Sequence, residues 1–257
     1  MNQAPRAMIA LLVLLPVACK GCQKQEVPQV TLAQEADKVI FASVEKIGAH
    51  RYIGRVTRAD SRDGGKPVSH EETVDLGWED WDNFRYSRLI NGEPAFEVLV
   101  ANSVPYIRRG TGRWEQRDDV EPYRVELEST WDTWDEAMEP FGYRVALTDQ
   151  GTEVIEGRPT TRYAVSLAPV PEVKGKGKKK GGATHSHFEP LTLSGTVWVD
   201  QTTAVRLVGD VSGSVQQGNL TRTIALRFAR SGFGEKQDIA PPPMARKARG
   251  TDGVVTP

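Results

Sequence analysis

The sequence predicts an α+β fold of mostly β class, in which helices pack on an antiparallel sheet. Apolar and polar residues alternate with period two through two long blocks, His50 to Arg109 and Val154 to Phe228. A segment with helical spacing separates the blocks, and glycine- or asparagine-containing turns divide the runs within them. Such alternation is typical of antiparallel strands with one wet and one dry face, because parallel strands are apolar on both.

Residues 1–18 have the three regions of a signal peptide. Arg6 is the only charge, an apolar run extends from Ala7 to Leu15, and the small Ala18 precedes Cys19. The run of about nine residues is much shorter than the roughly twenty that span a bilayer as a helix. We therefore expect export, with an ordinary secretory signal and an unmodified cysteine as the alternative.

The segment LLPVAC, which ends at Cys19, resembles the lipobox of bacterial lipoproteins, although Pro16 stands where that pattern prefers leucine. The resemblance implies lipidation of Cys19 and makes residues 19–30 a lipidated tether. A disulfide between Cys19 and Cys22 is the alternative in an oxidising compartment, and acylation of the Cys19 sulfur excludes it. Lys20, which follows in place of aspartate, resembles a signal to leave the inner membrane. The expected location is the cell envelope, facing the periplasm, with the outer membrane favoured over the inner.

Composition limits the classes of partner. A formal net charge of −1 gives no overall field that would attract nucleic acid, so no nucleic-acid partner is expected. Six Trp, six Tyr and seven Phe in a chain with 39% hydrophobic residues are compatible with a packed core. The length suits one β-rich domain, and the oligomeric state stays open.

The first predicted helix begins at Thr31, where Thr31 and Gln34 have the spacing of a capping box, and ends at Gly48. The first β block follows. Its alternating apolar positions are Tyr52, Val56, Val74, Leu76, Trp78, Phe84, Tyr86, Phe96, Val98, Val100, Val104 and Tyr106. Asp63-Gly64-Gly65 and Asn91-Gly92 have the residues that turns require.

A second helix is predicted between Val120 and Phe141. One face carries Leu127, Trp131, Trp134 and Met138, and acidic residues surround them. Two interpretations remain open: the stripe packs on the sheet as ordinary core, or it flanks a ligand cavity.

The second β block brings the expected total to nine to eleven strands. A Lys/Gly-rich loop at 169–190, with five lysines, interrupts this block, and residues 240–257 form an unpatterned, disordered tail. The lysines could contact anionic lipid headgroups, but a solvated loop is the simpler interpretation.

No catalytic constellation is found, because GxSxG, SxxK and HExxH are absent. His185 and His187 could meet a metal ion, but only Glu189 lies near them in sequence, so no metal site and no cofactor are expected. The second helix carries enough acidic residues for a pair of carboxylates to catalyse glycoside hydrolysis, but their number is the only feature that favours a hydrolase. We do not expect an enzyme.

The order of elements resembles the LolA/LolB-like lipoprotein carrier superfamily and its LppX/LprG-type relatives. The likeness lies in GTGRWEQRD (110–118), TEVIEGRPTTRYAVSL (152–167) and LSGTVWVDQTTAVRLVGDVSG (193–213). It covers residues 31–239, as one LolA-like β domain. The resemblance implies a curved antiparallel sheet, an open half-barrel, whose concave side two or more helices cover around an apolar cavity. It carries no catalytic residues.

Alternation within the strands and the helix suggests the residues that line such a cavity: Phe96, Val98, Tyr106, Trp131, Trp134, Tyr163 and Trp198. Trp198 alternates against Val197 and Val199, so it can point outward instead. The predicted function is that of a membrane-anchored bacterial lipoprotein that binds acyl lipid or a lipoprotein. A lipid-anchored β scaffold for protein–protein interaction in the envelope is the alternative, and an envelope hydrolase is the second alternative. An interior filled by side chains would favour the scaffold.

Overall fold

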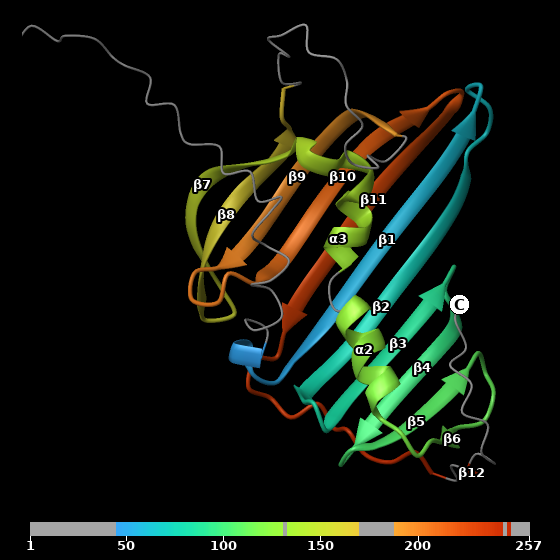
Figure 1. Ribbon diagram of the computed structural model, residues 1–257. Coiled ribbons are helices and arrows are strands. Elements are labelled where there is room, and N and C mark those ends of the chain that lie inside the picture. The colour runs from blue at the N-terminus through green and yellow to red at the C-terminus, as the bar shows by residue number, and fades with distance from the viewer. Residues whose placement is uncertain (1–44, 131–132, 170–187, 244–245, 248–257) are drawn as a thin grey trace, which may run out of the picture.

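The computed structural model describes residues 45–130, 133–169, 188–243 and 246–247, and it shows one large open sheet with short helices across one face (Figure 1). Ten strands have six residues or more, and two further strands, β6 (Glu115–Gln116) and β12 (Arg246–Lys247), have two residues each. The long strands are β1 (His50–Arg62), β2 (Val68–Asp80), β3 (Asn83–Ile90), β4 (Glu93–Ala101), β5 (Val104–Arg109), β7 (Val145–Ile155), β8 (Arg158–Leu167), β9 (Glu189–Asp200), β10 (Arg206–Gln217) and β11 (Leu220–Ser231).

The strand order is β12-β6-β5-β4-β3-β2-β1-β11-β10-β9-β8-β7. The first β block runs outward from the central strand β1 to β6, and the second returns from the opposite edge, β7, until β11 pairs with β1. All neighbours are antiparallel except β12 and β6. The predicted mostly β class, with an unclosed antiparallel sheet and a few short helices, is confirmed.

The helices connect the two outer edges of the sheet. The predicted helix between Val120 and Phe141 consists of α2 (Glu121–Thr130), α3 (Thr133–Met138) and the 3-10 helix η1 (Glu139–Arg144). Pro140 lacks a backbone N–H, and Gly142 has φ 53° and ψ −137°, so the α-helical hydrogen-bond pattern does not continue there. The helical region was predicted correctly, but its continuity was not.

The first predicted helix lies largely outside the described residues, whose first segment begins at Glu45. Residues 45–47 are helical, and Gly48 has φ 77° and donates its N–H to the Glu45 carbonyl oxygen at 3.1 Å. The predicted end of this helix at Gly48 is therefore confirmed.

Period-two alternation produces a continuous buried row across the first block. Tyr52 lies opposite Leu76, Leu76 opposite Tyr86, Tyr86 opposite Val98, and Val98 opposite Ile107. The predicted turn at Asn91-Gly92 joins β3 to β4, and both residues have the positive φ angles of a tight hairpin turn, 51° at Asn91 and 83° at Gly92. Turn chemistry therefore sets the strand register, and the register assembles the buried row.

The segment after β11 crosses the sheet toward β6. The Gln237 N–H donates to Glu79 Oε1 at 2.7 Å, and β12 pairs with β6. Residues 240–257 were predicted as a disordered tail, and residues 246–247 within this range form β12. Of the predicted loop at 169–190, residues 170–187 lie outside the described part, and Phe188 packs against the core.

Candidate apolar binding face

Apolar residues on the helix-covered face of the sheet form one large buried cluster with α2, α3 and η1. We call the sheet side of this cluster the inner face. Its members in the first block are Tyr52, Val56, Val74, Leu76, Trp78, Phe84, Tyr86, Val98, Val100 and Ile107. In the second block they are Leu147, Val165, Leu193, Val197, Leu207, Val211, Val215, Ile224, Leu226 and Phe228.

The start of α3 lies directly on the central strand. The Tyr52 hydroxyl is 2.7 Å from Thr133 Oγ1 and accepts the Thr133 backbone N–H at 3.1 Å. A Cβ atom on Gly54 would lie only 2.7 Å from Thr133 Oγ1. Glycine at this position therefore permits the close approach of α3 to β1.

Trp134 occupies the space between α3 and the second block. Its ring meets Phe228 edge to face, with centroids 6.3 Å apart, and the Arg206 guanidinium carbon lies 5.0 Å from its centroid. Arg206 Nη2 also donates to Asp135 Oδ1 at 2.8 Å. The predicted cavity residue Trp134 is thus buried between an aromatic ring and a cation.

Two further glycines let aromatic rings lie against the strand backbone. A Cβ on Gly209 would come within 2.3 Å of the Phe228 ring, and one on Gly213 within 2.7 Å of the Phe141 ring. Side chains from α3, η1 and the sheet therefore fill the space over β1, β10 and β11.

By contrast, α2 has a small apolar contact with the sheet. Among its described side chains, residues 121–128, only Leu127 is buried, whereas Val125 is 57% exposed. Figure 1 shows α2 crossing the strands of the first block. The part of the inner face under α2 is thus the less tightly covered part.

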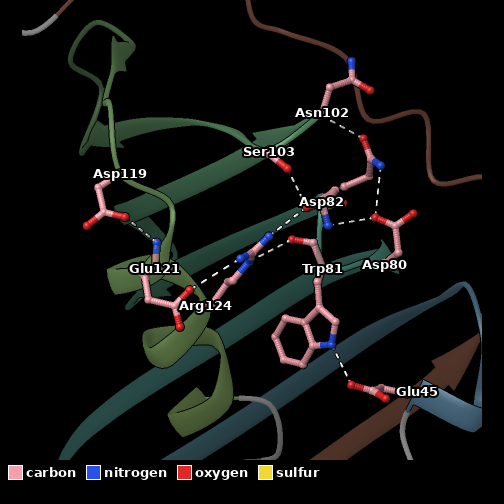
Figure 2. Close-up of polar contacts among 10 residues, drawn as sticks. Glu45, Asp80, Trp81, Asp82, Asn102, Ser103, Asp119, Glu121 and Arg124 are labelled. Carbon is pink, nitrogen blue, oxygen red and sulfur yellow. Dashed lines mark hydrogen bonds and ion pairs between the residues drawn. The ribbon is translucent and has the colours of Figure 1, made fainter.

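A polar network fixes the first turn of α2 to the sheet, as Figure 2 shows. Arg124 Nη2 donates to Asp82 Oδ1 at 2.7 Å, and Arg124 Nε donates to the Trp81 carbonyl oxygen at 3.2 Å. Ser103 Oγ donates to the same Asp82 oxygen, and Asp119 Oδ1 caps α2 by accepting the Glu121 N–H at 3.0 Å.

The same corner holds the end of the N-terminal helix. Trp81 Nε1 donates to Glu45 Oε1 at 2.6 Å, and the Trp81 ring meets Trp78 edge to face at 4.9 Å. The β2–β3 turn therefore contacts both α2, through Arg124, and the helical residues that begin at Glu45 (Figure 2).

Charged residues border the inner face beneath α2 and α3. Glu72, 6% exposed, pairs with Arg88 at 2.6 Å, and Arg58 pairs with Glu136 on α3 at 2.7 Å. Burial raises the pKa of the Glu126 carboxyl on α2, although Arg88 and Arg109 lower it. The apolar face thus ends in a polar, partly buried margin.

His50, at the start of β1, is a buried polar residue. Its Nδ1 lies 2.9 Å from the Gly48 carbonyl oxygen, and its Nε2 lies 3.1 Å from Arg230 Nη1. A neutral ring that donates from Nδ1 and accepts at Nε2 satisfies both contacts. Burial, with the charge of Arg230, lowers the His50 pKa to about 3. His50 lies two residues before the buried Tyr52 on the same strand, so period-two alternation was the sequence signal that its side chain is buried.

The structure separates the predicted cavity residues. Val98 and Trp134 are buried in the inner-face cluster, and Phe96 and Tyr163 are partly buried against it. Tyr106 belongs to a second cluster with Leu99 and Ala101. The turn after β4 pairs Val98 with Ile107 and Leu99 with Tyr106, so Ile107 takes the inner position that Tyr106 was expected to hold.

Trp198 also lies away from the inner face, as its alternation allowed. Its strand neighbour Val197 is fully buried in the inner-face cluster, whereas Trp198 Nε1 donates to Glu153 Oε2 at 2.7 Å. The Arg162 guanidinium carbon lies 5.4 Å from its ring. Trp131, the remaining predicted cavity residue, lies outside the described residues.

The predicted lipidation site Cys19, together with Cys22, His185 and His187, also lies outside the described residues. Within the part of the chain that the structure describes, no group of three or more His, Cys, Asp or Glu residues is arranged to hold a metal ion. No helix in that part is long and apolar enough to cross a membrane.

Comparisons with known proteins find structural likeness only. No protein-family model and no curated protein matches the sequence. The solved structure of the Mycobacterium tuberculosis lipoprotein LppX matches 80% of this chain and 97% of its own, at 15% identity and a TM-score of 0.29. A LolA superfamily protein from Nitrosomonas europaea matches 81% of this chain and 93% of its own, at 7% identity and a TM-score of 0.22.

A DUF1329 family protein from Desulfovibrio piger matches 78% of this chain and 93% of its own, at 11% identity and a TM-score of 0.26. Structures of both groups that the sequence resembles, LolA and LppX, are thus among the matches.

Proposed function

We propose that this protein is a membrane-anchored bacterial lipoprotein that binds acyl chains, from a lipid or a lipoprotein, on the inner face of an open half-barrel. The observation that carries the proposal is the apolar row Leu76, Tyr86, Val98 and Ile107, which continues across four strands near a lightly attached helix. An unclosed sheet leaves such a row accessible once its covering helix moves.

The energetics of α2 favour exchange with a ligand. Burying a leucine side chain contributes roughly 1.5–3 kcal/mol, and each buried methylene of an acyl chain contributes about 0.8 kcal/mol. An acyl segment of a few methylenes therefore offsets the loss of the Leu127 contact. The Arg124 contacts at the first turn would keep α2 attached at one end while its other end moves.

We propose Cys19 as the site of lipidation, which would hold the domain in the cell envelope, facing the periplasm, with the outer membrane favoured. The supporting features are the signal-like residues 1–18, the LLPVAC segment and Lys20. In bacteria fed a labelled fatty acid, the wild-type chain and a Cys22→Ser variant should be labelled, whereas a Cys19→Ser variant should not. Equal labelling of the Cys19→Ser and Cys22→Ser variants would contradict the assignment of Cys19 as the lipidation site.

The packing under α3 favours a second candidate, a lipid-anchored scaffold for protein interaction. Tyr52, Trp134, Phe141 and Phe228 fill the space over β1, β10 and β11. On this view, the sheet only presents its surfaces to an envelope partner. The two candidates differ in whether the region under α2 accepts an apolar ligand.

Native mass spectrometry of the full chain purified from bacterial envelopes, with lipid extraction, tests the proposal. We expect co-purifying acyl lipid at near-stoichiometric amounts and uptake of the apolar dye N-phenyl-1-naphthylamine by delipidated protein. Val98→Gln should reduce both, whereas Val125→Gln, on the exposed side of α2, should change neither. Thermal unfolding would establish that both variants are folded. If the wild-type chain carried no lipid and took up no dye, the protein-interaction scaffold would be the remaining candidate function.

A further inference from the structure

A small pocket lies at the end of β5, where the inner face meets the surface. Its volume is about 140 Å³, and it is lined by Ile107, Arg109, Gly112, Arg113 and Glu115. Ile107 is 4% exposed and belongs to the inner-face cluster, whereas Arg109 and Arg113 are exposed. The pocket is therefore apolar on its inner side and cationic at its mouth.

The two arginines of this pocket are available to a ligand. In the part of the chain that the structure describes, neither the Arg109 nor the Arg113 side chain forms a hydrogen bond or an ion pair. Glu115, the one carboxylate among the lining residues, is paired with Arg117 at 2.6 Å. The pocket mouth thus presents two positive charges beside a carboxylate that already has a partner.

The hairpin that bears the pocket is held from the other side. Arg108 pairs with Glu97, and its guanidinium carbon lies 4.8 Å from the Trp114 ring centroid. Trp114 packs against the second cluster, which contains Leu99 and Tyr106. These contacts fix the strand on either side of the turn, so the pocket arginines need not hold the loop in place.

The helix side of the pocket carries Glu126 and Tyr123, whose titration Arg109 influences. Burial raises the pKa of both side chains.

We propose that this pocket binds the oxyanion head group, a phosphate, of an amphiphile whose acyl chain lies on the inner face. The inference rests on the proposed function and specifies its ligand as an anionic amphiphile. Guanidinium groups bind phosphate oxygens through paired, charge-assisted hydrogen bonds, which neutral head groups cannot match. Ile107 connects the two parts of the site, because it lines the pocket and also belongs to the apolar row.

Calorimetric titration of the delipidated full chain with three probes, each below any micelle-forming concentration, tests this inference. Dodecyl phosphate should bind about tenfold more tightly than dodecyl maltoside, since one strong ionic contact contributes about that factor. Inorganic phosphate should bind weakly and compete with dodecyl phosphate. The double variant Arg109→Gln, Arg113→Gln should lose the preference for dodecyl phosphate and keep its affinity for dodecyl maltoside.

A matched control removes two arginines from the other face of the sheet, Arg85→Gln with Arg227→Gln, and should retain the preference. Equal affinity of the wild-type chain for both amphiphiles would overturn the head-group site and leave the proposed function intact. Arg109-dependent binding of inorganic phosphate without binding of either amphiphile would overturn the amphiphile ligand and the proposed function together. Loss of the preference in the control pair would overturn the pocket as its source.

Discussion

The Tyr52 hydroxyl accepts the backbone N–H of Thr133 at 3.1 Å and lies 2.7 Å from Thr133 Oγ1, so a residue of the central strand holds the first residue of α3. The two residues are 81 positions apart, and both are buried. A buried donor without its acceptor is costly, so this contact contributes to the position of α3 as well as to stability.

Tyr52→Phe should lower the free energy of unfolding by roughly 1–3 kcal/mol, because it leaves the Thr133 N–H without its acceptor. Urea unfolding measured by tryptophan fluorescence gives this value. Tyr163→Phe is the matched control, because the Tyr163 hydroxyl forms no hydrogen bond within the described residues. Equal effects of the two substitutions would contradict the role assigned to Tyr52.

Gly54→Ala should destabilise the protein by roughly 1–3 kcal/mol, because the added Cβ would overpack the contact between β1 and α3. Gly77→Ala, where the nearest atom to an added Cβ is the Gln237 side chain at 3.4 Å, should cost far less. Thermal unfolding of both variants tests the difference. A Gly54→Ala protein as stable as Gly77→Ala would show that α3 can move away from β1 at no cost.

His50 should make stability depend on pH. Its pKa is about 3 in the folded state and 6.5 for an unperturbed side chain, so the unfolded chain binds the proton more readily. The contribution of neutral His50 to the free energy of unfolding is therefore fully present above a pH of about 6.5, and it is lost as the pH falls toward about 3. The slope approaches roughly 1.4 kcal/mol per pH unit.

Urea unfolding measured from about pH 7 to about pH 5 separates the His50 effect from the titration of most carboxyl groups, which occurs at lower pH. His50→Gln should flatten the pH dependence in this window, because glutamine can still accept from Arg230 and does not titrate. His70→Gln, an exposed position, should leave it unchanged. A wild-type slope that survives in His50→Gln would assign the titration to another group.

Arg124→Met should loosen α2 without unfolding the sheet, because it removes the contacts to Asp82 and to the Trp81 carbonyl. Both charges are partly exposed, so global stability should fall by no more than about 1 kcal/mol. Hydrogen exchange should accelerate in residues 121–130, and N-phenyl-1-naphthylamine should enter faster. Arg85→Met serves as the control. Unchanged exchange in α2 would show that Leu127 alone holds the helix.

Short-range sequence patterns were sufficient to predict most strands and the helical region of this fold. Alternation from Tyr52 to Val100 identified the strands of the first block, and Asn91-Gly92 predicted the turn that joins β3 to β4. These features are local because side-chain alternation and turn preferences depend on neighbouring residues. The signal-like residues 1–18 and Cys19 are likewise features of the sequence alone.

The faces and partners of individual side chains depended on the tertiary structure. Tyr106 and Ile107 are neighbouring residues that can both pack in a core, and the register across the β4–β5 turn decides that Ile107 belongs to the inner face. The contact between His50 and Arg230, 180 residues away, has no local signature either. Local patterns in the sequence were enough to predict the strands and the helical region, and they are the basis of the expected anchor. Pairing between distant strands decided which side chains form the inner face, because moving a strand by one residue exchanges its two faces.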